Sequence, residues 1–437
     1  MALAKLNIFQ RLVRQWDTVH PYNGGQVLHL AGNPDLDLIS DAWWKTIIAL
    51  QLGPVRVAGK KYEFQTVDAL PRISVDNVKD KSISFEAYLS DVMNKPFPES
   101  GELPFRPFVF QSTGDTFYLG VIYQHWIADS SSIQLLLKEW FQRIYEPQSV
   151  VDEPVTISKV GYWAHFGPKR LKARMMEQML SLLRAFTRLR RAKKLMTKNS
   201  MDFNMACLVR RLPEGIIPRL LDTARRNGAT LNDLFLMVMS DVADRFTTFR
   251  SARARRDLAL GTIVDLRPHS VKPMDRVFGL YLGYANVVCT RRDLRSWPRL
   301  IRHIAAQTRI HKQVGSAQTG AVFMAVALAT GKFIKGAESY RFYRNSMPLS
   351  AGISNINMNQ SWAAKYYPDT LIEYIRISPT GPIVPLVFTT TTVGNNLLYG
   401  MTYRCSLYSA ERAQQMASLF EAHLIQLAEC GDALLRE

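Results

Sequence analysis

One stretch of this chain changes from a strand pattern to a helix pattern within a few residues. In 117–124 the side chains alternate with the period of two that is typical of a β-strand. In 133–144 the apolar side chains recur at helical spacing, and the serines at 130–132 offer N-caps for that helix. His125 and Asp129 lie in the turn between the two patterns. Turns of this kind project side chains from a rigid scaffold into a cleft, where catalytic residues are often found.

The histidine and the aspartate form a His-x-x-x-Asp pair that fits base catalysis. A neutral imidazole with a pKa near 7 can take a proton from a hydroxyl or an amine as that group attacks an acyl carbon. A histidine capped by a nearby carboxylate would give the same spacing, which arises by chance roughly once per two chains of this length. From the spacing alone the structural interpretation of His125 and Asp129 is favoured, so the catalytic one depends on the rest of the chain.

The length and composition predict two globular units inside a cell. A chain of 437 residues is long for one hydrophobic core and favours two packed units of about 200 residues each. Its 47% hydrophobic content excludes a disordered chain. The four cysteines are widely spaced and form no Cys-x-x-Cys pair, which argues against a zinc site or a disulfide framework. We therefore expect no zinc site and a cytoplasmic location.

No apolar run in the sequence approaches the ~18 residues that span a bilayer. The segment Leu3–Trp16 has apolar residues at helical spacing with basic residues between them, so it predicts an amphipathic helix and not a secretory signal. Such helices mostly pack on their own protein. The alternative is peripheral contact with an anionic membrane, here the inner membrane face.

The positive charge of the chain is concentrated in one segment. The formal net charge is +18, and 166–200 contains 11 basic residues against the single acid Glu177. Apolar residues along one face predict a basic connecting helix over 168–198, with a solvated face as the simplest role. Attraction to anionic lipid, to an acidic carrier protein or to the phosphates of coenzyme A are the functional alternatives. No nucleic-acid motif accompanies the charge, so we expect no nucleic-acid partner.

The sequence on either side of this basic segment predicts mixed α/β structure. In the first part we expect strands near Gln26–Leu30 and Phe117–Tyr123 and helices near Ser40–Leu52 and Ser132–Tyr145. In the second part we expect strands near Asn204–Leu212, Leu258–Leu266, Ile383–Val393 and Leu397–Cys405, with helices near Ile217–Asn227, Leu234–Phe249 and Ser409–Cys430. Two such halves favour a cleft between α/β layers.

Four motifs in a fixed order are similar to those of a known superfamily. They are His125-x-x-x-Asp129, then Ala229-Thr230-Leu231-Asn232-Asp233, then Val264-Asp265-Leu266-Arg267-Pro268 followed by Phe278-Gly279 and Asn286, and finally Ile353-Ser354-Asn355-Ile356. On these motifs the chain resembles the HxxxD acyltransferase superfamily. That superfamily includes chloramphenicol acetyltransferase, nonribosomal-peptide condensation domains, polyketide-associated acyltransferases and bacterial wax ester synthases. The motifs together cover nearly the whole chain.

The resemblance implies a fold and a domain organisation. The fold class is α/β (α+β), with two subdomains like chloramphenicol acetyltransferase in a V-shaped arrangement around a central substrate tunnel. We expect the N-terminal subdomain at 1–167, the basic helical connector at 168–200 and the C-terminal subdomain at 201–437. The acyl thioester would enter from one face and the acceptor from the other. The resemblance also implies no metal, no bound cofactor and no covalent acyl-enzyme.

The resemblance assigns roles to individual residues. His125 would be the general base that deprotonates the acceptor. Asp129 would be structural, pointing away from the substrate and pairing with an arginine that orients the loop, and Arg267 is our candidate. The tetrahedral oxyanion needs a hydrogen-bond donor. Candidates for that donor or for contacts to the acyl donor are Ser130, Ser131, Asn355 and the backbone amides at the start of the helix.

Three departures from the family pattern narrow the prediction. Peptide condensation domains usually carry a second histidine where this chain has Gln124, and a glycine where it has Ser130. A Cβ with a hydroxyl at that glycine position narrows the path of a pantetheine arm. The late segment Val393–Asn396 does not reproduce the Asp-Phe-Gly-Trp-Gly signature of plant acyltransferases and many condensation domains. These differences favour a free-standing bacterial type.

We therefore expect an acyltransferase that moves an acyl group from a thioester to a small-molecule alcohol or amine acceptor. The co-substrate would be acyl-coenzyme A or the phosphopantetheine thioester of an acyl-carrier protein. The alternative within enzymes is a stand-alone condensation enzyme that forms an amide or ester from a carrier-bound acyl or aminoacyl group. An alternative of another class is a non-catalytic binding or scaffold protein that kept the fold.

Overall fold

A computed structural model of the chain consists of two compact units, each made from three segments. The first unit comprises Met1–Pro168, Arg267–Tyr281 and Gln360–Ile377, and the second comprises Lys169–Leu266, Leu282–Asn359 and Ser378–Glu437. The structure describes residues 3–66, 76–79, 82–98, 102–112, 114–159, 165, 180, 183–184, 187–196, 201–250, 252–314, 328, 347–360 and 369–436.

The division into units differs from simple chain order. The boundary predicted at 167/168 falls at the end of the first continuous segment, Pro168. The predicted boundaries left no place for the two later segments, 267–281 and 360–377, which belong to the first unit. Most of the predicted connector at 168–200 lies outside the described residues.

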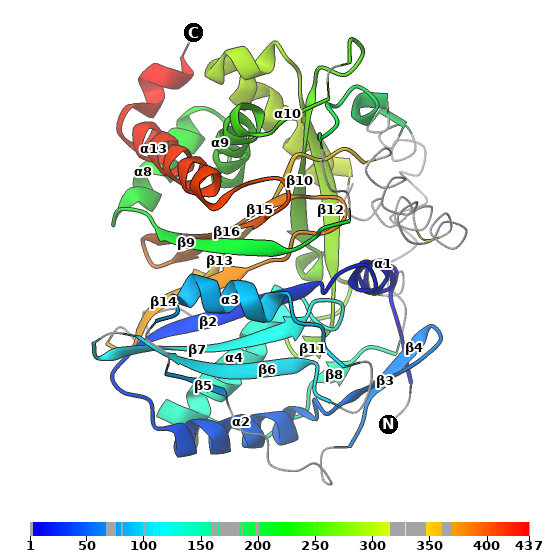
Figure 1. Ribbon diagram of the computed structural model, residues 1–437, viewed down its shortest axis with the longest axis vertical. Helices are drawn as coiled ribbons and strands as arrows, with labels where there is room; N and C mark the ends of the chain where they lie inside the picture. The colour runs from blue at the N-terminus through cyan, green and yellow to red at the C-terminus, as the bar shows by residue number, and fades with distance from the viewer. Residues whose placement is uncertain are drawn as a thin grey trace. The chain divides into compact units, whose positions relative to one another are not determined.

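The first unit is built on a five-stranded sheet with helices on both faces (Figure 1). Its strands are antiparallel except for the parallel outer pair, β5 with β6. Their order is β14 (Leu371–Ile377), β2 (Asn23–Ala31), β7 (Thr116–Gln124), β6 (Phe105–Gln111) and β5 (Asp76–Val78). Figure 1 shows α2 (Leu36–Leu50) and α4 (Ser130–Tyr145) on one side of this sheet and α3 (Phe85–Met93) on the other.

Aromatic side chains join the helices of the first unit. The rings of Trp43 on α2 and Trp140 on α4 meet edge to face at 4.7 Å, and both side chains are fully buried. The indole N–H of Trp140 donates to the carbonyl of Ile39 at 3.0 Å, so its burial leaves no unpaired donor. The α2–α4 contact therefore fixes the helix that begins directly after the His-x-x-x-Asp motif.

The N-terminal segment is only partly the helix that the sequence predicts. Residues Ala4–Lys5 form β1, which pairs with β4 (Lys61–Phe64), and β4 pairs in turn with β3 (Val55–Ala58). Helix α1 begins at Ile8 and ends at Asp17, because Asn7 caps it through a capping box with Gln10. The prediction of a helix from Leu3 was therefore wrong for its first turn. Among the described parts of the chain, no helix is long and apolar enough to cross a membrane.

The first unit also contains shorter elements outside its main sheet. A two-stranded parallel ribbon pairs β8 (Thr156–Ile157) with β11 (Val277–Phe278). The remaining elements are the 3₁₀ turns η1 (Pro147–Ser149) and η2 (Arg267–His269). The ribbon brings the late segment 267–281 beside the N-terminal part of the chain.

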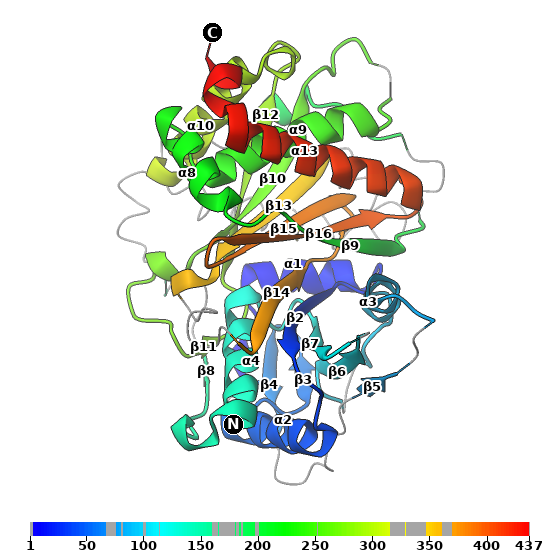
Figure 2. The ribbon, with the colours of Figure 1, turned by 90° about the vertical axis from the view of Figure 1, so that its left-hand side faces the viewer.

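The second unit has a six-stranded mixed sheet with a layer of helices on one face (Figure 2). Its strand order is β12 (Leu282–Cys289), β10 (Leu258–Asp265), β13 (Ala351–Asn357), β15 (Leu386–Val393), β16 (Asn396–Arg404) and β9 (Met205–Arg211). The pairs β10–β13 and β13–β15 are parallel and the others antiparallel. The covering helices are α8 (Ile216–Arg226), α9 (Leu231–Phe246), α10 (Trp297–Val314) and α13 (Ala410–Leu435), and the 3₁₀ turns are η3 (Asp293–Arg295) and η4 (Met358–Gln360).

Helix α9 is the buried centre of this layer. Thr230 is its N-cap and forms a capping box with Asp233, whose other carboxylate oxygen accepts from Thr308 at 2.7 Å. The run from Leu234 to Met239 is fully buried. The motif at 229–233 therefore starts an apolar helix, as predicted, and its polar residues are used to begin and anchor that helix.

Candidate active site

His125 follows directly on strand β7 and is held between two tyrosine rings. Its backbone N–H donates to the carbonyl of Tyr22 at 3.1 Å. The Tyr22 ring stacks on the imidazole with 5.7 Å between centroids, and the Tyr123 ring meets it edge-on at 5.5 Å. Burial raises the pKa of Tyr123 to about 12, so this ring is neutral at physiological pH. The imidazole thus has a fixed plane and apolar walls.

The hydrogen bond at Nδ1 decides which tautomer His125 adopts. Nδ1 lies 3.1 Å from the carbonyl oxygen of Ala128, and a carbonyl oxygen can only accept. Nδ1 therefore carries the proton, and the lone pair of the neutral ring is on Nε2. Among the residues that the structure describes, none forms a hydrogen bond with Nε2. Burial, helped by the positive charge of Arg376, lowers the pKa of His125 below its usual value, which keeps the ring neutral near pH 7.

Asp129 is fully buried and caps helix α4. Its Oδ1 accepts from the backbone N–H of Ser132 at 3.0 Å, so Asp129 is the N-cap and the helix begins at Ser130. The prediction that the serines at 130–132 cap the helix was therefore wrong. A carboxylate is the better cap here because it also accepts, through Oδ2, the N–H of Tyr281 at 2.8 Å.

Arg267 forms an ion pair with Oδ2 of Asp129, and both belong to the first unit. The second arm of the same guanidinium donates to Ser132 Oγ at 2.9 Å and to the carbonyl of Val277 at 3.1 Å. One arginine thus ties the start of α4 to the segment 277–281. Whether this contact supports catalysis stays a prediction.

Gly279 allows the segment 277–281 to approach the motif. Its carbonyl accepts from the backbone N–H of Asp129 at 3.0 Å and from Ser132 Oγ at 2.9 Å. Its φ is +148°, and an added Cβ would lie 2.9 Å from the Tyr281 ring. A side chain at this position would be strained in both respects, so a glycine is required.

Ser130 joins a buried polar network on strands β2 and β14. Its Oγ accepts from Gln26 Nε2 and from Arg376 Nε, both at 2.8 Å. The hydroxyl of Tyr374 donates to Gln26 Oε1 at 2.5 Å. Two donors occupy the two lone pairs of Oγ, so the hydrogen of the Ser130 hydroxyl remains for an outside acceptor.

The other predicted donor, Asn355, lies on β13 of the second unit. Its Oδ1 accepts from the hydroxyl of Thr390 at 2.9 Å. This bond orients the amide within the sheet of its own unit. A role for Asn355 in binding an oxyanion or an acyl donor stays a prediction.

Two further contacts shape the surroundings of the His125 loop. Gln124 Nε2 donates to Asp17 Oδ2 at 3.3 Å, so the residue in place of the second histidine connects β7 to the end of α1. A Cβ on Gly24 would lie 2.7 Å from the ring of Tyr123, so glycine leaves room for the tyrosine beside the imidazole.

Sequence reasoning missed several residues of this site. Arg376 is only 3% exposed, and burial lowers its pKa to about 10, so it stays a cation at neutral pH. The sequence did contain an indication of this buried charge, because Arg376 is the single charged residue within the otherwise apolar run Tyr374–Ile377. Gln26 and Tyr22 carried no comparable signal. The described residues contain no cluster of three or more histidine, cysteine, aspartate or glutamate side chains that could hold a metal ion.

Comparison with solved structures confirms the predicted fold. The condensation domain from the polyketide synthase MokA of monacolin K biosynthesis superimposes with a TM-score of 0.66 at 13% identity, covering 98% of each chain. The cyclization–docking bidomain of EpoB from Sorangium cellulosum gives 0.67 at 13% identity, over 98% of this chain and 85% of that one. The first condensation domain of the CDA synthetase gives 0.64 at 13% identity, over 100% and 98%.

No protein-family model and no curated protein sequence matches the chain. The structural matches establish that the chain has the α/β condensation-domain fold, which is the fold of the HxxxD acyltransferase superfamily. It is a fold of transferase-type enzymes.

Proposed function

We propose that this chain catalyses a condensation reaction between a carrier-bound donor and a small acceptor. The donor would be an acyl or aminoacyl group held as a phosphopantetheine thioester on an acidic carrier protein. The acceptor would be an amine or an alcohol, and the product an amide or an ester. The observation that carries the proposal is the geometry of His125, whose Nδ1 is bound to the Ala128 carbonyl and whose Nε2 lone pair is free of partners among the described residues.

In the proposed step, Nε2 of His125 takes the proton of the acceptor as its nitrogen or oxygen attacks the thioester carbon. The resulting tetrahedral intermediate collapses with cleavage of the carbon–sulfur bond. The leaving thiolate then takes the proton back from the imidazolium, so the histidine is regenerated and no acyl-enzyme forms. The lowered pKa of His125 favours this cycle, because the ring starts neutral at the pH of the cell.

The network at Ser130 supports stabilisation of the oxyanion. The hydroxyl hydrogen of Ser130 is available, and Arg376 donates to the same oxygen, which polarises the hydroxyl toward donation. A donor fixed before the reaction costs no reorganisation when charge develops. In this scheme Arg376 is a positioning residue and Ser130 the group that would touch the substrate.

Asp129 and Arg267 would hold the geometry without taking part in proton transfer. Among the described residues, the Asp129 carboxylate bonds to the backbone at the start of α4, to Tyr281 and to Arg267, and it forms no hydrogen bond with the imidazole. We therefore assign both residues a structural role, as the resemblance implied.

The structural neighbours favour a carrier-bound donor over free acyl-coenzyme A. Two of these neighbours are condensation and cyclization domains of polyketide and nonribosomal-peptide synthetases, and a third is a four-domain nonribosomal-peptide synthetase. Sequence identities of 13–15% carry the fold and not the substrate, so the donor must be tested directly.

The test compares donors and a histidine variant. The same acyl or aminoacyl group is presented on a phosphopantetheinylated carrier protein and as a free coenzyme A thioester, with pooled amines and alcohols. Product is followed by mass spectrometry and free thiol by colorimetry. We expect turnover with the carrier-bound donor and a loss of about 10²–10⁴ in rate for His125→Ala. His269→Ala is the matched control, because that side chain is exposed in the same unit, and its rate should be unchanged.

Three outcomes would contradict parts of the proposal. An unchanged rate in His125→Ala would exclude the histidine as the base. Equal turnover of free coenzyme A thioester would exclude the carrier requirement. Binding of carrier-bound donor without any turnover would favour the scaffold protein that kept the fold.

A further inference from the structure

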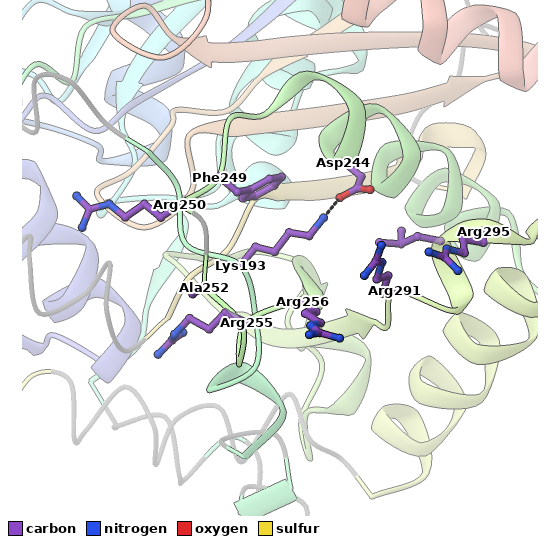
Figure 3. Close-up of a pocket in the computed structure, with 10 residues that line it drawn as sticks. Lys193, Asp244, Phe249, Arg250, Ala252, Arg255, Arg256, Arg291 and Arg295 are labelled. Carbon is purple, nitrogen blue, oxygen red and sulfur yellow. Dashed lines mark hydrogen bonds and ion pairs between the residues drawn. The ribbon is translucent and has the colours of Figure 1, made fainter.

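The second unit has a pocket whose walls are mainly basic (Figure 3). Its volume is about 480 Å³, within the about 300–1,000 Å³ that is usual for small-molecule sites. The lining residues are Lys193, Asp244, Phe249, Arg250, Ala252, Arg255, Arg256, Arg291, Leu294 and Arg295. None of them belongs to the His125 site, and the basic pocket is named here by this set.

Backbone hydrogen bonds connect the segments that form the basic pocket. The segment 191–196 pairs with the connection between α9 and β10, with Lys193 N–H donating to the Asp257 carbonyl at 2.7 Å and Arg250 N–H to the Lys194 carbonyl at 2.8 Å. Leu195, which faces Phe249 across this pairing, is 3% exposed. The third wall is the connection from β12 to α10, which includes η3. Three chain segments thus hold the cations in place.

The positive charge of the basic pocket is poorly compensated. Five arginines and one lysine face a single lining carboxylate, Asp244, which forms its ion pair with Lys193. Among the described residues, none of the five arginines forms an ion pair with a carboxylate, although Arg255 and Arg256 each donate to a backbone carbonyl, at 3.1 Å and 3.0 Å. The neighbouring carboxylate of Asp293 is bound by Thr290 and His303.

Three arginines are the best placed to act together. In Figure 3 the side chains of Arg256, Arg291 and Arg295 lie on the Asp244 side of the pocket, whereas Arg250 points away from them. A guanidinium cannot lose its proton in a protein, so repulsion within such a group is relieved only by a bound anion or by solvent and salt.

We propose that the basic pocket binds the polyphosphate group of a small molecule. Guanidinium groups match phosphate oxygens with paired, charge-assisted hydrogen bonds, and several of them from different segments suit a chain of phosphates better than one. The apolar residues Phe249, Ala252 and Leu294 give the remaining part of the ligand a surface to contact. A concave site of this volume favours a small ligand over a protein surface.

The experiment uses the full chain and sodium tripolyphosphate as the probe, titrated calorimetrically at about 0.15 M salt. The test variant is Arg291→Gln with Arg295→Gln. The matched control is Arg253→Gln with Arg292→Gln, which removes the same charge at exposed residues outside the pocket lining, one on the α9–β10 connection and one on the β12–α10 connection. We expect the test variant to raise the Kd at least about tenfold and the control to change it less than about twofold. Thermal unfolding of each variant verifies its fold.

A second set of titrations distinguishes sources of the phosphate chemistry. Adenosine 3′,5′-bisphosphate and adenosine triphosphate are compared with inorganic tripolyphosphate. Tighter binding of either nucleotide, lost in the test variant, identifies a nucleotide ligand, and equal affinities identify the phosphate chain alone. Both results support the proposal.

Three results would overturn it. The wild-type chain could fail to bind any of the three probes. The two double variants could weaken binding equally, which would mean unspecific attraction. An acidic carrier protein could displace the probe with the same dependence on Arg291 and Arg295, which would make the pocket a protein-docking surface. None of these depends on turnover at His125.

Discussion

The His125 loop and the basic pocket arrange charge in opposite ways. At the loop, Asp129 is fully buried and its carboxylate is matched by Arg267 and by two backbone N–H groups. In the basic pocket, six cations from three segments share one lining carboxylate. The first arrangement neutralises charge to fix a geometry. The second leaves positive charge without nearby carboxylates in the pocket lining, which favours binding an anion.

The comparison shows how to distinguish an ion pair that stabilises the fold, such as Asp129 with Arg267, from a binding site. An intact buried ion pair contributes little net stability. Removing one partner leaves the other charge buried without a counter-charge, which strongly lowers the stability of the fold. Each exposed cation changes the free energy of unfolding only slightly, and salt screens its interactions with other charges. Variants that remove a charge should therefore lower the free energy of unfolding strongly at the His125 loop and change it very little in the basic pocket.

The largest expected effect is that of removing the buried carboxylate charge. Asp129→Asn should lower the free energy of unfolding by about 3–5 kcal/mol, because Arg267 would be left without its counter-charge. The measurement is chemical denaturation followed by fluorescence. Asp91→Asn is the control, since Asp91 pairs with Lys95 on an exposed helix face, and it should change stability by less than about 1 kcal/mol.

A double-mutant cycle sharpens this prediction. If Asp129 and Arg267 act as one unit, combining Asp129→Asn with Arg267→Gln should cost much less than the sum of the single changes. Additive losses would mean that Asp129 and Arg267 are not energetically coupled. The contrast between paired charge at the His125 loop and unpaired charge in the basic pocket would then be wrong.

The next largest effect is that of Ser130, the residue after Asp129, on turnover. Ser130→Ala should reduce turnover about 10²-fold, because it removes the hydroxyl donor that Arg376 and Gln26 orient. The KM for the donor should change less than kcat if the contact forms mainly in the transition state. Ser131→Ala is the matched comparison, and an equal loss there would move the donor role away from Ser130.

The sequence predicted the frame of the first site well. The strand at β7, the helix at α4 and the positions of His125 and Asp129 followed from two hydrophobic periods within one continuous stretch. Arg267 was named from a motif that ends a strand, and the structure brings it into contact with Asp129 across 138 residues of sequence. Local patterns succeed for β7, α4 and the turn between them because these segments are adjacent in sequence, whereas Arg267 was named with the help of the family resemblance.

The sequence could not predict the parts of the site that depend on distant pairing. Strand β14 joins the sheet of the first unit beside β2, although Tyr374 lies 346 residues after its partner Leu28 in the sequence. No periodicity in 371–377 tells which sheet receives it. Gln26 and Arg376 meet at Ser130 only because of that register, so the network at Ser130 was missed. Most of the predicted basic helix lies outside the described residues.

The pH dependence tests the electrostatic side of the comparison. Burial, and to a smaller degree Arg376, hold the pKa of His125 below 6.5, so the acid limb of kcat/KM should lie below pH 6.5. Arg376→Gln removes a positive charge that disfavours imidazolium, so this pKa should rise and the limb should move to higher pH. Arg376→Lys keeps the charge and should leave the limb nearer its original position. A limb that does not move in Arg376→Gln would exclude the electrostatic coupling of Arg376 to His125.

The smallest expected effect is in the basic pocket, where its sign is opposite to that at the loop. Arg291→Gln with Arg295→Gln should raise the free energy of unfolding by roughly 0.5 kcal/mol at low salt, because like charges at exposed positions repel by a few tenths of a kcal/mol per pair. The gain should vanish near about 1 M salt, where the screening length is only about 3 Å. At the same concentration of tripolyphosphate the wild-type chain should be stabilised more than this variant, since the stabilisation by a ligand grows with its affinity for the folded state. A loss of stability at low salt would mean that these arginines brace the fold as Arg267 does, and the distinction between the two regions would disappear.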